Sequence, residues 1–367
     1  SVSRGLGDVY KRQYSTLAVS LIKKIVSEGR GIRKRKKRKG FITPSVSFAE
    51  RWKIYMKPKV SVIMPVYNAE EFIAKAIESI LNQTYIDFEF IMIIDCPTDD
   101  TLNIIKRYND KRIRVIYNEY NSGIAYSRNR GLSVSRGKYV ALMDDDDISS
   151  RDRLERQVDF LEENSDIDIL GGRSQTINEL GKIISTSTVA LTNPLYINAM
   201  LLFRNVLING TVMMRKDFIE KYGLCYKDNC LGMEDFRFWI DCSKVGRITN
   251  LDEVLLLYRK SQYNETNRVR QIKNEERCRL FSFLQKYSLE SSGISLPVEQ
   301  LMVINKVLAE VGGRCESMEE IVKFYEALKG VVNQAEKSNC YNKREIKIAC
   351  RKLLGEKIGL CEWLWTK

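Results

Sequence analysis

Residues 60–95 read VSVIMPVYNAEEFIAKAIESILNQTYIDFEFIMIID, and this stretch decides the fold. The mostly apolar run 60–66, which contains Pro65, is typical of a buried parallel strand. Residues 72–81 repeat apolar side chains at helical spacing, and a second apolar run, 88–94, stops at Asp95. A strand, a helix and a strand in this order predict the first unit of an α/β sheet.

The alternation of strands and helices continues beyond this stretch. Asn68 and Glu71 are expected to form a capping box for the first helix. Further strands are expected at 113–117 and 138–143, with a helix at about 124–135 between them. Short connections of this kind predict an α/β fold with a doubly wound, mostly parallel sheet, in which ligands bind beyond the carboxyl ends of the strands.

Four aspartates, Asp144, Asp145, Asp146 and Asp147, follow the strand expected at 138–143. Carboxylates this close repel one another unless a cation neutralises part of their charge. Mg²⁺ and Mn²⁺ bind to one or two carboxylates together with phosphate oxygens, so the run predicts a site for a metal and a diphosphate. The simpler alternative is an N-terminal cap for a helix starting near residue 150, which Asp147 or Ser149 could supply alone.

The composition excludes several classes of chemistry. The chain has 367 residues, of which 44% are apolar and 29% charged, as in globular proteins of two or three domains. It contains no histidine, which excludes Ser-His-Asp and Cys-His catalysis and zinc sites built on imidazole. Its nine cysteines include no CxxC pair, and we expect free thiols in a reducing cytoplasm.

The net charge of +13 is concentrated at the beginning of the chain. Residues 1–59 contain 17 Lys and Arg but 3 Asp and Glu, whereas the rest of the chain is nearly neutral. An apolar helix face at 14–26 precedes eight basic residues within 30–39, which predicts attachment of residues 14–39 to an anionic membrane surface. A solvated disordered arm is the main alternative, and a nucleic-acid partner is not expected.

Residues 1–13 are excluded from the prediction of the fold. Their DVYKRQ resembles the in-frame translation of a transposon-type sequencing adapter, so we expect them to be an artefact.

Three motifs together resemble the catalytic domain of glycosyltransferase family 2, which has a GT-A fold. They are the stretch 60–95, NSGIAYSRNRGL at 121–132 and GKYVALMDDDDIS at 137–149, and the resemblance covers about residues 60–260. It implies an inverting transfer of a sugar from a nucleotide-diphosphate donor, with a UDP-sugar favoured, to a saccharide or lipid-linked saccharide acceptor. It also implies Mg²⁺ or Mn²⁺ as cofactor and a role in the synthesis of a surface polysaccharide such as capsule, O-antigen or exopolysaccharide.

The resemblance assigns the donor side of the site residue by residue. Pro65 and Tyr67 are implied to line the nucleoside pocket, and Asp95 to hydrogen-bond the base or ribose. Arg128, in the SRN of the second motif, is implied to lie on the nucleotide-sugar side.

The aspartate run supplies the family's DxD motif. Asp144 and Asp146 match its two acids, and Asp146 is implied to be the main metal ligand. Asp145 is implied to contact the ribose or the sugar.

A second acidic motif, GMEDFRFW at 232–239, resembles the family's ED motif, in which a carboxylate acts as base. Inverting transfer needs such a base to take the proton of the acceptor hydroxyl. Asp235 matches the catalytic position best, and Glu234 is the alternate. The simpler alternative is the acidic first turn of a helix that is buried through residues 238–240.

The sequence departs from the family pattern at three places. Ile94, Cys96 and Pro97 replace residues of the frequent DDGSTD motif, and Asn209 stands where many members have histidine. Lys260 follows Arg259 at a third place, where histidine is again frequent, so no histidine ligand carries over. The QxxRW motif of processive members is absent, which predicts the transfer of one sugar per encounter.

We expect a basic leader at 1–58, a GT-A domain at 59–265 and a helical region at 266–367. The GT-A domain is expected to divide into a nucleotide-binding half, 59–150, and an acceptor half, 151–265. The enzyme is expected in the cytoplasm, at the inner face of the plasma membrane. The alternatives are a non-catalytic GT-A-fold binding protein attached through its leader, and a nucleotidyltransferase, which would need a basic loop where VYNAEE stands.

Overall fold

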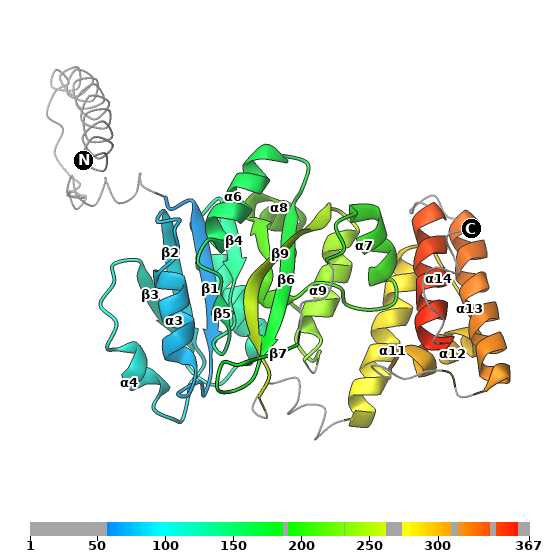
Figure 1. Ribbon diagram of the computed structural model, residues 1–367, viewed down its shortest axis with the longest axis horizontal. Coiled ribbons are helices and arrows are strands. Elements are labelled where there is room, and N and C mark those ends of the chain that lie inside the picture. The colour runs from blue at the N-terminus through cyan, green and yellow to red at the C-terminus, as the bar shows by residue number, and fades with distance from the viewer. Residues whose placement is uncertain are drawn as a thin grey trace, which may run out of the picture. The chain divides into compact units, whose positions relative to one another are not determined.

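The computed structural model describes residues 57–185, 190–230, 232–261, 274–309, 315, 317–337 and 343–358. The chain from residue 57 onward forms one compact unit (Figure 1). The predictions for the leader, including membrane attachment through residues 14–39, lie outside the described residues. The boundaries proposed within 59–367 stay predictions.

The first strands lie where the apolar runs predicted them. β1 (Val60–Val66), β2 (Phe88–Ile94) and β3 (Ile113–Tyr117) have the predicted bounds, and β4 (Tyr139–Leu142) lies within the predicted range. Three helices connect these strands, namely α3 (Ile73–Leu81), α4 (Thr101–Ile105) and α5 (Ile124–Val134). The α/β fold class is therefore confirmed.

The sheet has nine strands in the described part of the chain, in the order β3-β2-β1-β4-β8-β6-β9-β5. The remaining strands are β5 (Ile148–Ser149), β6 (Ile169–Ile177), β7 (Ile183–Ser185), which pairs with β6, β8 (Met213–Arg215) and β9 (Ile248–Arg259). The strands β3, β2, β1 and β4 are parallel, whereas β8 is antiparallel to both of its neighbours. The carboxyl ends of β1, β2 and β4 thus meet at one edge.

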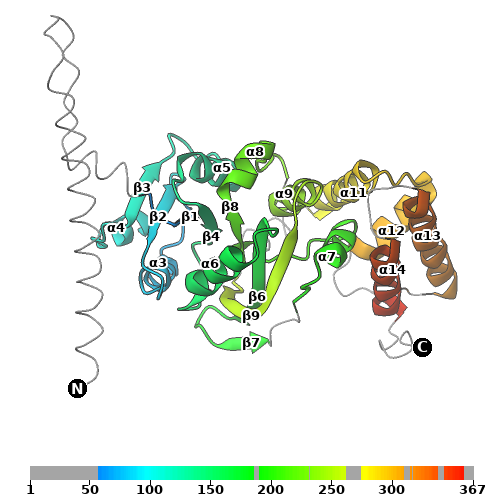
Figure 2. The ribbon, with the colours of Figure 1, turned by 90° about the horizontal axis from the view of Figure 1, so that it is seen from above.

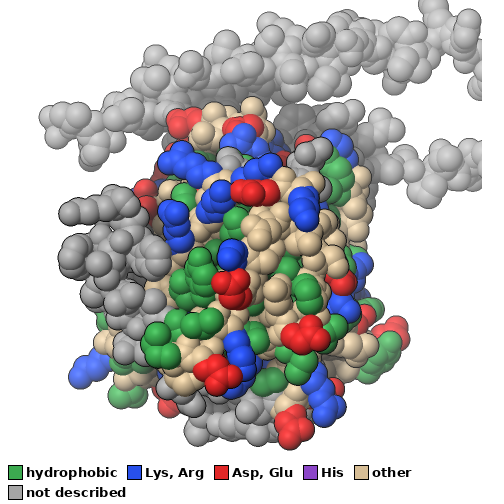
Figure 3. Space-filling view, turned by 90° about the vertical axis from the view of Figure 1, so that its right-hand side faces the viewer, with side chains coloured by type: hydrophobic (Ala, Val, Ile, Leu, Met, Phe, Trp, Pro, Cys, Tyr) green, Lys and Arg blue, Asp and Glu red, His purple; other side chains and the backbone are tan. Residues whose placement is uncertain are grey.

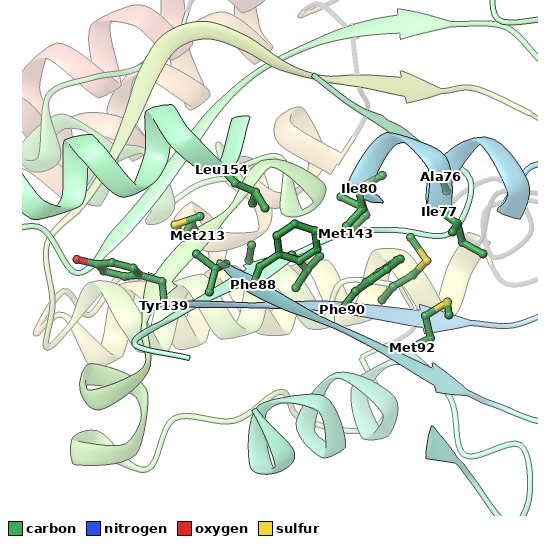
Figure 4. Close-up of a cluster of buried hydrophobic side chains, with 14 of the residues drawn as sticks. Ala76, Ile77, Ile80, Phe88, Phe90, Met92, Tyr139, Met143, Leu154 and Met213 are labelled. Atoms are coloured by element: carbon green, nitrogen blue, oxygen red, sulfur yellow. The ribbon is translucent and has the colours of Figure 1, made fainter. Parts of the chain in front are cut away.

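Helices cover both faces of the sheet because the side chains of a strand alternate between its faces. On one face, Val62 and Met64 of β1 belong to a buried cluster with α3 and α6 (Arg153–Glu163), part of which is shown in Figure 4. On the other face, Ile63 packs with α5, α8 (Lys216–Tyr222) and α9 (Glu234–Ser243). Figure 2 shows α3 and α6 on one side of the strands and α5 and α8 on the other.

The predicted capping box of the first helix is wrong. α3 begins at Ile73, and Asn68 adopts a left-handed backbone conformation with a φ of 46°. The Asn68 Oδ1 accepts a hydrogen bond from the Thr98 N–H at 2.8 Å, and the Glu70 carboxylate accepts one from the Asp100 N–H at 2.7 Å. These polar side chains therefore tie the loop after β1 to the loop after β2.

The helical region predicted after residue 266 is confirmed in its described part. It consists of α11 (Asn274–Ser291), α12 (Val298–Ala309), α13 (Met318–Lys337) and α14 (Lys343–Ile358). These helices share a buried cluster with α7 (Pro194–Leu201), so they pack directly on this helix. Their outer end carries apolar side chains interspersed with charged ones (Figure 3).

Two further findings concern the described residues as a whole. Their cysteines are free thiols, as expected for Cys96, Cys225, Cys230, Cys242, Cys278, Cys315 and Cys350. Among the helices that the structure describes, none is both long and apolar enough to cross a membrane.

The packing of α5 on β1 leads to a stability prediction for Gly131. A Cβ at this helical position would overlap Cγ2 of the buried Ile63. We expect Gly131→Ala to lower the free energy of unfolding by about 1–3 kcal/mol, because overpacking outweighs the better helix propensity of alanine. Urea denaturation of the purified protein would measure the change.

Gly330 in α13 is the matched control. An added Cβ there meets the end of the flexible Gln300 side chain, which can move away. Gly330→Ala should therefore raise the free energy of unfolding by about 0.5–1 kcal/mol. Equal effects of the two substitutions would contradict tight packing of α5 on β1.

Candidate active site

Loops that follow three parallel strands meet at the carboxyl edge of the sheet. The Tyr67 N–H, just after β1, donates to Oδ2 of Asp145, which follows β4, at 3.0 Å. The Asp95 N–H, just after β2, donates to the carbonyl of Val66 at 2.9 Å. The structure therefore brings together the predicted donor residues of these loops.

Pro65 and Tyr67 lie at this edge in different settings. Pro65 is half-buried within β1 and is paired in register with Ile93 of β2. The side chain of Tyr67 is 39% exposed, so its ring can contact a ligand.

Asp95 is buried and holds the beginning of α5. Its Oδ1 accepts hydrogen bonds from Asn118 Nδ2 at 2.6 Å and from the Ser122 N–H at 2.9 Å, and its Oδ2 accepts one from the Gly123 N–H at 2.8 Å. Gly123 has a φ of 84°, in the left-handed region that glycine adopts without strain. Because a carboxylate has about four acceptor positions, Asp95 retains capacity for a base or ribose.

Three of the four aspartates have clearly different environments. Asp144 pairs with an arginine, and Asp145 accepts the hydrogen bond from Tyr67. Asp147 is buried; its Oδ1 accepts from the Arg259 N–H at 2.7 Å, and its Oδ2 has no partner. Burial and the negative charge of Asp146 hold the pKa values of Asp145 and Asp147 well above the usual range.

Arg259, at the end of β9, anchors the aspartate loop. Its Nε donates to the carbonyl of Asp146 at 2.7 Å, and its Nη1 donates to the carbonyls of Asn178 and Glu179, each at 3.0 Å. The guanidinium also lies 4.6 Å from the centroid of the Phe72 ring. Sequence reasoning missed this role, although an arginine that ends an apolar strand was a signal.

The residues of this loop fit a cation that is shared with a ligand. The described residues include no group of three or more Asp, Glu or Cys side chains placed to hold a metal by themselves. A divalent ion here would rest on one or two carboxylates and on phosphate oxygens, as Mg²⁺ commonly does. Burial and the crowded negative charge together raise the pKa values of Asp145 and Asp147, and a bound cation would offset both effects. Asp144 and Asp146 are its candidate ligands.

A buried arginine joins the aspartate loop to α9. The side chain of Arg128, on α5, is 4% exposed. Its Nη2 donates to Oδ1 of Asp144 at 3.0 Å, and its Nη1 donates to Oε1 of Glu234 at 2.7 Å. The ring of Tyr226 lies beneath the guanidinium, 5.4 Å from its carbon to the ring centroid. Arg128 therefore lies between the two acidic motifs rather than on the donor side alone.

The two acids of the ED motif are in different states. Glu234 is buried and paired with Arg128, whereas the half-buried Asp235 has no arginine bound to it among the described residues. The Asp235 Oδ1 accepts from the Phe236 N–H at 2.6 Å, and its Oδ2 accepts from Asn205 Nδ2 at 2.9 Å. Burial and the negative charge of Glu234 raise the pKa of Asp235 to about 7, the range in which a general base works best at neutral pH.

Two asparagine contacts near this pair were not predicted, one with Asp235 itself and one with Tyr226. Asn205 contacts Asp235 from the segment after α7, and nothing in the local sequence around it indicates that contact. Asn209 is buried in the short 3₁₀ helix η2 (Asn209–Thr211), and its Oδ1 accepts a hydrogen bond from the Tyr226 hydroxyl at 3.5 Å.

Comparison with known proteins identifies the family. Residues 61–223 match the family described as glycosyl transferase family 2. An uncharacterized glycosyltransferase of Haemophilus influenzae is 35% identical over 276 residues, which cover 69% of this chain and 84% of the relative. The chain belongs to glycosyltransferase family 2. The family and the enzyme class predicted from the sequence are thus confirmed.

Two further glycosyltransferases show what members of similar sequence or fold bind. An Escherichia coli relative, named UDP-Glc:alpha-D-GlcNAc-diphosphoundecaprenol beta-1,3-glucosyltransferase WfgD, is 30% identical over 59% of this chain and 83% of its own. The crystal structure of S. aureus TarS 1-349 in complex with UDP-GlcNAc superposes with a TM-score of 0.56 over 82% of this chain and 89% of the TarS 1-349 chain, at 19% identity. This likeness shows that the glycosyltransferase has the GT-A fold.

The ion pairs of Arg128 lead to a second stability prediction. Arg128→Met leaves the buried Glu234 and the half-buried Asp144 without their cation, so we expect the free energy of unfolding to fall by roughly 3–5 kcal/mol. Arg156 on α6 is the control, because its pairs with Asp152 and Glu253 are exposed and Arg156→Met should change little. Guanidinium denaturation measures both, and equal losses would contradict the structural role of Arg128.

Proposed function

We propose that this glycosyltransferase is metal-dependent and inverting. It moves a sugar from a nucleotide-diphosphate donor, with a UDP-sugar favoured, to a saccharide or lipid-linked saccharide acceptor. The observation that carries the proposal is the joining of Asp144 and Glu234 by Arg128, which supports a metal–diphosphate site close to the base. The UDP-glucose and diphosphoundecaprenol in the name of the E. coli relative, and the UDP-GlcNAc bound by TarS, support this choice of substrates.

On the donor side, the end of β1 and the loops after β1 and β2 bind the nucleoside through Pro65, Tyr67 and Asp95. Asp144 and Asp146 would hold Mg²⁺ or Mn²⁺ against the diphosphate, and Asp145 contacts the ribose or sugar. When bound, the cation would stabilise the negative charge that develops on the leaving diphosphate. Arg128 keeps the carboxylate of Asp144 in place by its hydrogen bond.

On the acceptor side, Asp235 takes the proton of the attacking hydroxyl. Its pKa of about 7 leaves a large fraction of the carboxylate ionised at neutral pH, while it still accepts a proton readily. Glu234 has a different role, because its Oε1 already accepts a hydrogen bond from the buried Arg128. One base on the acceptor side is what a single, inverting displacement requires.

The cellular setting follows from the acceptor. A lipid-linked saccharide lies at a membrane, and attachment through residues 14–39 would bring the enzyme to the cytoplasmic face where such an acceptor is elongated. Synthesis of a surface polysaccharide is the process that fits this acceptor.

The metal site can be tested with Asp146→Ala. Removal of the main ligand should weaken Mn²⁺-dependent binding of UDP by more than about tenfold, because even indirect metal contacts contribute this much. Asp152→Ala is the control, since this exposed aspartate pairs with Arg156 away from the loop and should leave UDP affinity unchanged. Calorimetric titration of UDP with and without Mn²⁺ measures the effect. An unchanged Mn²⁺-dependent affinity in Asp146→Ala would contradict the assignment of Asp146 as the main metal ligand.

The base can be tested with Asp235→Asn and with pH. Because the raised pKa means that Asp235 is protonated below about pH 7, wild-type kcat/KM should decline as the pH falls through 7. Asp235→Asn should bind UDP normally but lose turnover by about a hundredfold or more. The release of UDP from UDP-glucose or UDP-GlcNAc measures the pH dependence of kcat/KM and the turnover of the variant. Full turnover by Asp235→Asn would mean that the base is Glu234 or another residue.

A further inference from the structure

The segment Leu201–Asn205, which begins at the last residue of α7, connects the C-terminal helices to the ED motif. Two buried side chains of α11 hold its backbone. Gln285 Nε2 donates to the carbonyl of Phe203 at 2.8 Å, and Ser288 Oγ donates to the carbonyl of Leu201 at 3.0 Å. The backbone just before Asn205 is thus fixed by a helix outside the GT-A motifs.

The same segment is also fixed by α14 and by packing. The Arg204 guanidinium donates to both carboxylate oxygens of Glu356, at 2.8 and 3.0 Å. Phe203 is fully buried in the cluster that the C-terminal helices form with α7. Bidentate pairing and burial leave Arg204 and Phe203 little freedom, so Asn205 has a defined starting position.

The amide of Asn205 is oriented by a second contact. Its Oδ1 accepts a hydrogen bond from the Leu207 N–H at 3.0 Å, which leaves Nδ2 to face Asp235. Nδ2 then donates to Asp235 Oδ2 at 2.9 Å. A neutral donor fixed in this way stabilises the ionised form of the carboxylate and sets the direction of its free lone pairs.

We propose that Asn205 is a positioning residue for the base Asp235, and that α11 holds Asn205 in place through the segment Leu201–Asn205. The proposal rests on the proposed function, because it gives a role to the contact partner of the base. It also gives the C-terminal helices a part in catalysis that requires no contact with substrate.

Other groups around Asp235 are charged or titratable. Glu234, on the same helix, raises its pKa, Arg128 of α5 lowers it, and Asp144 raises it; Tyr226 and Cys230 also lie within electrostatic range. Since Asn205 carries no charge, Asn205→Ala leaves these interactions in place and removes one hydrogen bond to the carboxylate. The pKa of Asp235 should therefore rise.

The test compares three variants by UDP release from UDP-glucose and UDP-GlcNAc with Mn²⁺, across neutral pH. Asn205→Ala should lower kcat by roughly tenfold or more and shift the acidic limb of kcat/KM upward by about one pH unit, with UDP affinity unchanged. Asn205→Asp should shift the limb further, because a second carboxylate repels the charge of Asp235. Asn198→Ala is the control, because this half-buried amide of α7 donates to the carbonyl of Ser243 and does not contact Asp235.

A second readout does not require turnover. A group whose folded-state pKa is raised contributes stability below its unfolded pKa, and this contribution is lost as the pH rises through the folded pKa. Between acid and alkaline pH, the free energy of unfolding should therefore fall by a larger total in Asn205→Ala than in the wild type. In an Asp235→Asn background, Asn205→Ala should no longer change this pH dependence. An unshifted limb together with an unchanged pH dependence of stability would overturn the role of Asn205.

The part played by α11 is tested by a double-mutant cycle. Gln285→Met removes the hydrogen bond to Phe203 with little change of volume. If this variant fails to fold, Ser288→Ala replaces it in the cycle and removes the hydrogen bond to Leu201. Each should lower kcat in the wild-type background but have little further effect in Asn205→Ala, because both substitutions act on the same contact. Fully additive losses would overturn the coupling through α11.

Failure of this inference is distinct from failure of the proposed function. If Asp235→Asn turns over normally, the base assignment fails, whatever Asn205 does. If Asp235→Asn is inactive while Asn205→Ala matches the wild type in every readout, the proposed function stands and only the positioning role fails.

Discussion

The ion pairs of Arg128 are the constraint on which the rest of the site depends. A buried guanidinium is stable only where anions compensate for its lost hydration, and Asp144 and Glu234 provide them. These carboxylates belong to the loop after β4 and to the first turn of α9, so α5, the aspartate loop and α9 must assemble together. The aspartate loop and the ED motif are therefore parts of one charged network rather than two independent modules.

The sheet explains why that network forms at its particular edge. β1, β2 and β4 are parallel neighbours, so the loops after them converge, and hydrogen bonds from Tyr67 and Asp95 lock the loops together. Arg259, at the end of β9, anchors the aspartate loop by its hydrogen bond to the carbonyl of Asp146. Around the ED motif, the C-terminal helices extend the same scaffold, because α11 holds the segment whose Asn205 donates a hydrogen bond to Asp235.

Much of this arrangement could be predicted from local sequence patterns. β1 and β2 were placed correctly because both of their faces are buried, which produces continuous apolar runs, and the position of Asp95 at the strand end followed from the topology. The partners of Arg128 could not be predicted in this way, because Glu234 is 106 residues distant and no local pattern encodes that contact. The helix start at Asn68 was predicted wrongly, because the Asn68 side chain instead accepts a hydrogen bond from the Thr98 N–H in the loop after β2.

The most direct test of the shared network is the titration of UDP, with Mn²⁺, into Arg128→Lys and the wild type, after both are shown to be folded. A lysine keeps the positive charge but lacks the planar fork with which Arg128 bridges Asp144 and Glu234 through two nitrogens. We expect UDP to bind at least about tenfold more weakly to the variant, because hydrogen bonds between charged groups contribute roughly this much. Equal affinity for UDP in the two proteins would contradict the dependence of the donor site on Arg128.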